Sequence, residues 1–91
     1  MKRVNRDELI KWLDKFFSFV DTSESFNGSN GGVWLSGEEC ESTYSGMRIY
    51  DYYSESSMYE LGVLNKFEEV LQKKGWFSEW YDSGTVMIWE I

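Results

Sequence analysis

The chain has 91 residues and a net charge of −7, and it contains no His, no Pro and a single Cys. This composition excludes mechanisms that need an imidazole group, disulfide frameworks, and zinc sites built from Cys and His. Hydrophobic residues make up 42% of the chain, so we expect a single domain over residues 1–91 with one packed core.

The first predicted element is an amphipathic helix that follows Asn5. Asn5 is a good capping residue, and Glu8 lies three positions later, where its side chain can reach back to the cap amide. Apolar residues then recur at the spacing of one helical face, namely Leu9, Ile10, Leu13, Phe16, Phe17 and Val20. The pattern predicts a helix that continues to Val20 and packs against a flat apolar surface.

The middle of the chain is predicted to hold two strands joined by polar connections. Residues 21–32 are rich in Gly and Asn-Gly signals, which predict a loop. Residues 33–35 form a short apolar run that is consistent with a buried strand, and residues 36–46 form an acidic connection around Cys40. A second strand is expected at residues 47–53, with Met47 and Ile49 on one face.

A second helix is predicted after Ser57. Glu60 follows three residues later and completes a capping box. The expected apolar line of this helix consists of Leu61, Leu64, Phe67 and Leu71. Lys73 and Lys74 suit a last helical turn, and Gly75 can adopt the left-handed conformation that ends a helix.

The C-terminal region is predicted to be a β-hairpin. Its strands are residues 76–81 and 85–91, and the connection Asp82-Ser83-Gly84 suggests a three-residue loop with Gly84 in the left-handed conformation. The expected order is therefore α-β-β-α-β-β. This order predicts a two-layer α+β fold in which two helices pack on one face of a largely antiparallel four-stranded sheet.

No enzyme chemistry is predicted from the sequence. Glu38, Glu39 and Glu41 could in principle supply an acid and a base or a weak divalent site, but adjacent acids on a loop are more typical of a solvated charge run. A calcium loop beginning at Asp21 fails because Phe26 and Gly32 stand where Gly and a bidentate Glu are needed. We expect no catalytic residue, no metal and no cofactor.

The distribution of charge predicts a partner-binding surface instead. Residues 21–65 carry eight carboxylates and one basic residue, Arg48, interleaved with Ser, Thr and Tyr. This excess either aids solubility or presents carboxylates where a basic protein expects phosphates. The candidate partner-binding residues are Glu38, Glu39, Glu41, Tyr44, Asp51, Tyr52, Glu55 and Glu60. The expected partner is a basic, nucleic-acid-binding protein, with no direct binding of nucleic acid or membrane.

Residues 38–55 form a Tyr-rich acidic segment that is similar in composition to segments of a known class of proteins. It reads Glu38-Glu39-Cys40-Glu41-Ser42-Thr43-Tyr44 and then Tyr50-Asp51-Tyr52-Tyr53-Ser54-Glu55. In size, charge and composition the chain resembles small acidic phage-encoded inhibitors of host defence, of the anti-CRISPR and DNA-mimic kind. The resemblance implies a stoichiometric blocker of a DNA-binding host protein. Basic residues before residue 20 depart from a uniformly acidic mimic, namely Lys2, Arg3, Arg6, Lys11 and Lys15.

The aromatic C-terminal hairpin supports a second hypothesis. One face of the hairpin must cover the helices, and the other has few polar residues, so either a loop folds across that face or it is an interaction surface. In the latter case the domain would self-associate through residues 76–91. Because no apolar run approaches the roughly 20 residues of a membrane span and no signal peptide is evident, a cytoplasmic location is expected.

Overall fold

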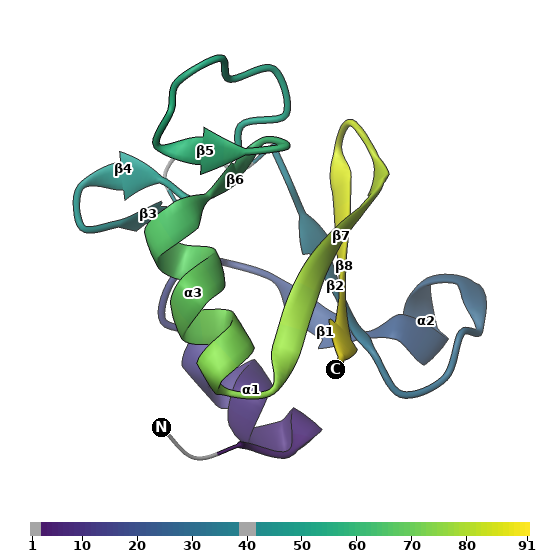
Figure 1. Ribbon diagram of the computed structural model, residues 1–91. Coiled ribbons are helices and arrows are strands. Elements are labelled where there is room, and N and C mark those ends of the chain that lie inside the picture. The colour runs from purple at the N-terminus through teal and green to yellow at the C-terminus, as the bar shows by residue number, and fades with distance from the viewer. Residues whose placement is uncertain (1–2, 39–41) are drawn as a thin grey trace.

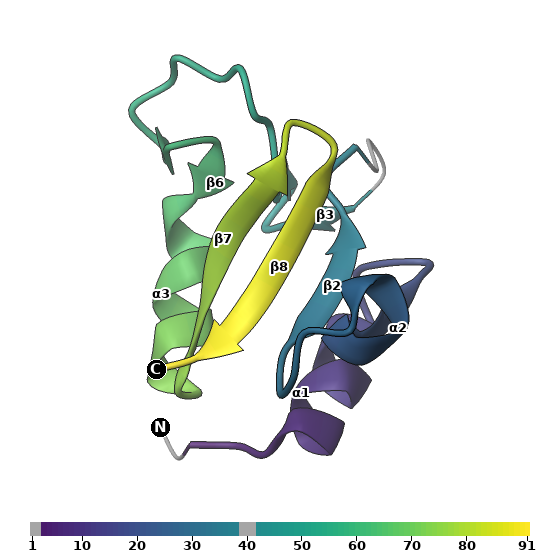
Figure 2. The same cartoon turned by 90° about the vertical axis from the view of Figure 1, so that its right-hand side faces the viewer.

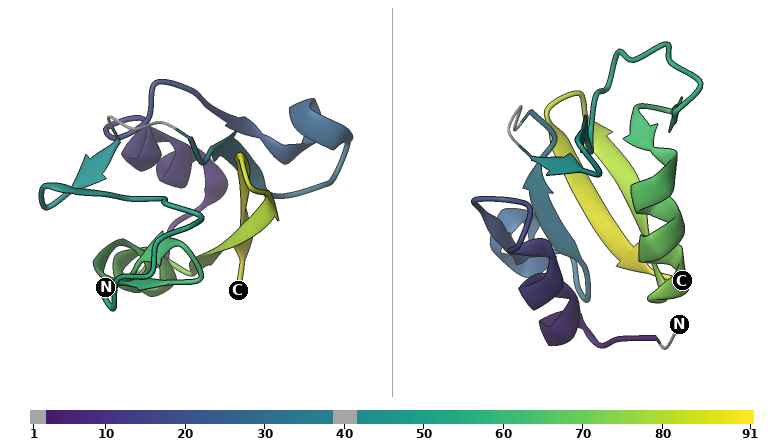
Figure 3. Two further views of the ribbon diagram at one scale, coloured as in Figure 1. Left: turned by 90° about the horizontal axis from the view of Figure 1, so that it is seen from above. Right: turned by 90° about the vertical axis from the view of Figure 1, so that its left-hand side faces the viewer.

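A computed structural model describes residues 3–38 and 42–91 and confirms the predicted α+β class (Figure 1). Its centre is a four-stranded sheet in which every pairing is antiparallel. In spatial order the strands are β1 (Val20–Thr22), β2 (Val33–Ser36), β8 (Thr85–Glu90) and β7 (Trp76–Asp82). Two helices, α1 (Arg6–Leu13) and α3 (Asn65–Lys73), lie on one side of this sheet (Figure 3).

Smaller elements complete the fold. The predicted loop at residues 21–32 is wrong in its first part, which holds the end of β1 and a short helix, α2 (Ser23–Asn27). Helix α2 lies on the side of the sheet opposite α1 and α3 (Figure 2). Two small hairpins lie beyond one end of α3, as Figure 1 shows. They are formed by β3 (Thr43–Tyr44) with β4 (Met47–Arg48), and by β5 (Tyr59–Glu60) with β6 (Val63–Leu64).

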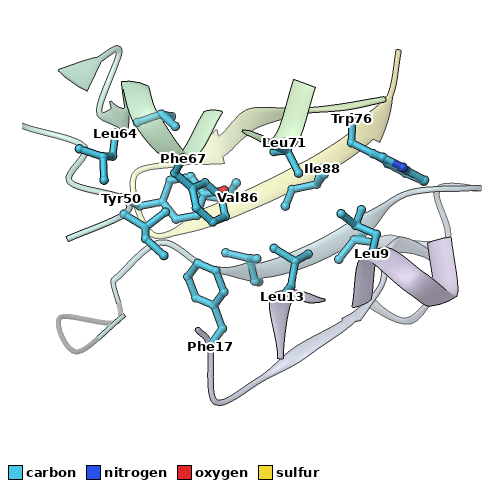
Figure 4. Close-up of a cluster of buried hydrophobic side chains, with 14 residues drawn as sticks. Leu9, Leu13, Phe17, Tyr50, Leu64, Phe67, Leu71, Trp76, Val86 and Ile88 are labelled. Carbon is cyan, nitrogen blue, oxygen red and sulfur yellow. The ribbon is translucent and has the colours of Figure 1, made fainter. Parts of the chain in front are cut away.

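The core lies between the inner face of the sheet and the two helices. Alternation along the strands points Val33 and Leu35 inward, and both are fully buried. Val86 and Ile88 lie opposite them on β8 and are also fully buried. The helices contribute a second set of fully buried side chains, drawn in Figure 4, that includes Leu9, Leu13, Phe67 and Leu71.

Phe67 is the centre of an aromatic cluster within this core. Its ring is fully buried and lies within 5.2–6.3 Å, centroid to centroid, of five other rings. These belong to Trp12, Phe16, Phe17, Tyr44 and Tyr50. One side chain of α3 therefore joins the N-terminal segment to the segment on either side of β4.

The first helix begins as predicted but ends earlier. The Asn5 side chain accepts the Glu8 amide, and the Glu8 carboxylate accepts the Asn5 amide, so the capping box is confirmed. The helix stops at Leu13 and not at Val20, because the chain tightens into turns after Leu13. Val20 instead pairs with Leu35 at the edge of the sheet. The helical spacing of apolar residues continues beyond Leu13 because Phe16 and Phe17, in the turns that follow, still pack on the core.

The predicted strand at residues 47–53 is wrong in extent and position. Only Met47 and Arg48 form a strand, and they pair with β3, so the fourth strand of the main sheet is β1. Ile49 and Tyr50 are both buried, and Tyr50 forms an isolated bridge with Val63 instead of extending β4. Burial raises the pKa of the Tyr50 hydroxyl, which lies 2.9 Å from the Ser78 hydroxyl.

The second helix ends as predicted but begins later. Ser57 and Glu60 do not cap a helix, because residues 59–64 form the β5–β6 hairpin and α3 begins at Asn65. The helix ends at Lys73, and Gly75 follows in the left-handed conformation with a φ of 93°. The stop signal was therefore correct, while the start signal was overridden by strand pairing.

The C-terminal hairpin is confirmed, but its loop is shorter than the predicted three residues, because Asp82 belongs to β7 and pairs with Thr85. Gly84 does not have a positive φ. Its amide donates to the Asp82 carboxylate at 2.9 Å, and a Cβ at residue 84 would lie 2.9 Å from the Glu38 carboxylate. On the outer face of the hairpin, α2 provides partial cover, because Phe26 packs between Trp34 and Tyr81 with ring centroids 4.8 and 5.0 Å away.

Replacing Phe67 with Ala should remove the centre of the aromatic cluster. We expect the free energy of unfolding to fall by about 3–5 kcal/mol, because the substitution leaves a cavity in the core. The five surrounding rings belong to different segments, so they cannot all move inward to fill it. Urea unfolding of Phe67→Ala would measure this loss, and Phe77→Ala on the half-buried outer face of β7 serves as the control. A loss below about 1 kcal/mol for Phe67→Ala would contradict the central role of this ring.

Candidate partner-binding surface

The structure places most of the predicted binding residues at the end of the domain that carries the small hairpins. Tyr52, Glu55 and Glu60 are exposed, and Glu38 and Asp51 border the same region. Tyr44 lies apart from them, because its half-buried ring packs against Phe67 and Phe16 in the core. Glu39 and Glu41 lie outside the described residues.

A hollow of about 330 Å³ brings Glu38, Asp51 and Tyr52 together. Arg48 also lines it, with its guanidinium 3.9 Å from the Asp51 carboxylate. Both side chains of this ion pair are more than one third exposed, so the pair contributes little to stability. Arg48 is the one basic residue among the described residues that line this hollow.

A second hollow, of about 500 Å³, lies between α3, β7 and the β5–β6 turn. Its lining includes the carboxylates of Glu60, Glu68 and Glu69 and, within the described part of the chain, no Lys or Arg. The Glu68 carboxylate is held in place because it accepts the Ser78 amide of β7 at 3.1 Å. The sequence did not identify Glu68 and Glu69 as candidate binding residues. It placed them on a helix, but it could not show that they line a hollow beside β7.

The two hollows meet at a pair of aromatic side chains. Tyr52 lines the first hollow and Trp80 the second, and their ring centroids lie 4.9 Å apart. The Trp80 indole N–H donates to the Leu61 carbonyl at 2.6 Å, which fixes the turn that borders the second hollow. We call the surface formed by these two hollows and Glu55 the acidic surface.

Hydrogen bonds fasten the segment that carries much of the acidic surface. The Tyr59 hydroxyl donates to the Arg48 carbonyl at 2.6 Å, and the Asp51 amide donates to the Gly62 carbonyl at 2.8 Å. The Asn65 amide donates to the Met58 carbonyl at 2.9 Å and closes the other side. Because these bonds join the segment to itself and to α3, its backbone needs little further ordering on binding.

Two further acids of the central segment lie elsewhere. Glu24 is at the start of α2, where it forms an ion pair of 2.7 Å with Arg6 and accepts the Gly31 amide at 3.0 Å. The Gly31 amide, the amide of Glu24 itself and the Arg6 guanidinium lower the pKa of Glu24 to about 2. The Asp21 carboxylate accepts the neighbouring Thr22 amide. Arg6 therefore has a structural role, because it holds Glu24 at the start of α2.

The carboxylates of the acidic surface attract positively charged groups. Within residues 3–38 and 42–91, no three Asp, Glu or Cys side chains are close enough together to hold a metal ion. Over the same residues, no helix has the length and apolar character needed to cross a membrane.

Comparison with known proteins gives no match to a protein-family model, to a curated protein or to a solved structure.

The Glu24 interactions predict a pH-dependent contribution to stability. Because the pKa of Glu24 in the folded protein lies below its ordinary value of 4.5, its contribution is present above pH 4.5 and is lost as the pH falls toward 2. We expect Glu24→Gln to lower the melting temperature at neutral pH. The difference from the unmodified protein should shrink between pH 4.5 and pH 2.

Thermal unfolding across this pH range would test the prediction, with Glu55→Gln as a control at an exposed carboxylate. A Glu24→Gln difference that stays constant from neutral pH down to pH 2 would show that the ionised carboxylate is not what stabilises this contact.

Proposed function

We propose that the domain is a binding protein that occupies a basic surface of a partner, and that the partner is a nucleic-acid-handling protein which it inhibits. The observation that carries this proposal is the pair of adjacent hollows lined by Glu38, Asp51, Glu60, Glu68 and Glu69. Arg48 is the one basic residue among the described residues that line these two hollows. No catalytic step is part of the proposal.

Electrostatics supports a protein partner with a positive surface. Carboxylates that line a concave surface create a local negative potential, which attracts basic groups and speeds their association. The same potential repels phosphates, so nucleic acid itself and anionic membranes are unfavourable partners. A protein that normally binds nucleic acid offers the complementary field. Inhibition of such a host defence protein in the cytoplasm is the function that this surface would serve.

The aromatic side chains of the acidic surface support a specific contact. Tyr and Trp are enriched among the residues that carry most binding energy, because they bury large rigid areas and keep one polar end. Tyr52 is 44% exposed and Tyr53 is 79% exposed, and both line the hollow that Glu38 borders. A surface that served solubility alone would have no need of exposed rings beside its charges.

Self-association through the outer face of the sheet is a second candidate function. Phe19 and Tyr81 are 47% and 56% exposed at the two ends of the row of rings that passes through Trp34 and Phe26. Pairing through the sheet edge at Thr22 is disfavoured, because its amide and carbonyl are already bonded to side chains. Sedimentation of the purified protein distinguishes a dimer that Tyr81→Ala weakens from a monomer.

Charge reversal of two exposed acids tests the first proposal. The protein is immobilised, exposed to a bacterial lysate at low salt and washed with increasing salt. We expect it to retain a basic protein that salt releases, because screening weakens the attraction between exposed charges. The double variant Glu55→Lys, Glu60→Lys should bind that protein at least about tenfold more weakly.

A matched variant keeps the change of net charge constant. Asp7→Lys, Asp14→Lys alters two exposed acids of the α1 region, away from the acidic surface, and should retain the partner unless net charge alone decides binding. Equal retention by the Glu55, Glu60 variant and the unmodified protein, with both folded, would refute the proposal.

A further inference from the structure

Leu61 occupies an unusual position in the β5–β6 hairpin. Its side chain is 86% exposed, and its φ is 51°, in the left-handed region that residues with a Cβ seldom adopt. Gly62 follows with a φ of 78°. Two successive positive φ values define a tight two-residue turn for which Asn-Gly is the favoured sequence. The equivalent turn between β3 and β4 has Ser45 and Gly46, with φ values of 54° and 81°.

The fold gains little from a Leu at residue 61. A left-handed Leu brings its Cβ close to the backbone, and Asn tolerates the same conformation better. The exposed side chain buries almost no apolar surface within the molecule. Strain combined with exposure at one residue is the pattern of a position whose side chain serves an external contact.

The turn holds Leu61 rigidly. The Leu61 carbonyl accepts the Trp80 indole N–H at 2.6 Å, and the Gly62 carbonyl accepts the Asp51 amide at 2.8 Å. A Cβ at residue 62 would lie 2.8 Å from the Cα of Tyr52, so the turn packs directly on the neighbouring backbone. The exposed side chain is therefore presented on a fixed support, which reduces the entropy lost on binding.

Apolar and acidic groups surround this turn. Tyr52, whose backbone contacts Gly62, has an exposed ring that packs against Tyr53 at 5.0 Å. Glu60 precedes Leu61 in the chain and lines the same hollow as Leu61 and Glu69. The arrangement is an apolar projection bordered by carboxylates, so its complement is an apolar pocket bordered by Lys and Arg.

We propose that Leu61 is the apolar anchor of the contact with the partner, and that it inserts into an apolar pocket whose border carries basic side chains. This inference rests on the proposed function and adds to it. The carboxylates steer and orient the partner, while the buried Leu61 side chain supplies much of the affinity.

The first arm of the test needs no partner. Leu61→Asn should unfold at the same temperature as the unmodified protein or at a higher one, because Asn suits the left-handed turn position. A lower melting temperature would overturn the inference, since Leu61 would then be held for the stability of the fold.

The second arm measures binding to the protein that salt releases from the immobilised domain. We expect Leu61→Asn to raise the Kd for this purified protein at least about tenfold. The matched control is Ile91→Asn, which alters another exposed apolar side chain at the C-terminus, 63% exposed, and should leave the Kd unchanged.

The outcomes separate the two proposals. If the unmodified protein and Leu61→Asn bind equally while the Glu55, Glu60 reversal binds weakly, the acidic surface stands and the role of Leu61 is refuted. Equal losses for Leu61→Asn and Ile91→Asn would also refute it. If the unmodified protein retains no protein that salt releases, the proposed function fails and the inference falls with it.

Discussion

The packing of aromatic rings on Phe67 attaches the segment that carries much of the acidic surface to the helices. Tyr44 and Tyr50, which flank β4, both pack on Phe67, and rings from the α1 region pack on it as well. The segment between β3 and α3 contains little regular structure of its own, so these ring contacts attach it to the helices. The ring contacts and the hydrogen bonds of the segment together fix its arrangement, because two-residue strands are not stable alone.

The chain changes from buried to mostly exposed after Tyr50. In a regular strand Tyr50 and Tyr52 would share one face, yet Tyr50 is buried and Tyr52 is 44% exposed. Strand β4 ends at Arg48, Tyr50 forms an isolated bridge with Val63, and residues 51–58, most of them exposed, then lead to β5. Residues 51–60 carry the exposed Tyr rings and several of the carboxylates of the acidic surface, and the other carboxylates lie beside this segment.

Sequence patterns predicted the elements with strong local signals and missed β1, α2 and the β5–β6 hairpin. The Asn5 cap, the Gly75 stop and the hairpin of residues 76–91 depend on neighbouring residues and were correct. Strand β1 was missed because Val20 continues a helical spacing, and its pairing with Leu35 is a contact between distant residues. At the site, the signal for the β5–β6 turn was Leu61-Gly62, but Leu is rarely found at a left-handed position, so the apolar pattern favoured a helix there.

The central claim is that the acidic surface takes the place of phosphates on a partner, and competition tests it most directly. The purified partner is bound to labelled double-stranded DNA at low salt, and the domain is then added in increasing amounts. The account predicts that the domain displaces the DNA and that no complex contains all three components, because both ligands need the same basic groups. A stable ternary complex, with DNA still bound while the domain is bound through its acidic surface, would contradict it.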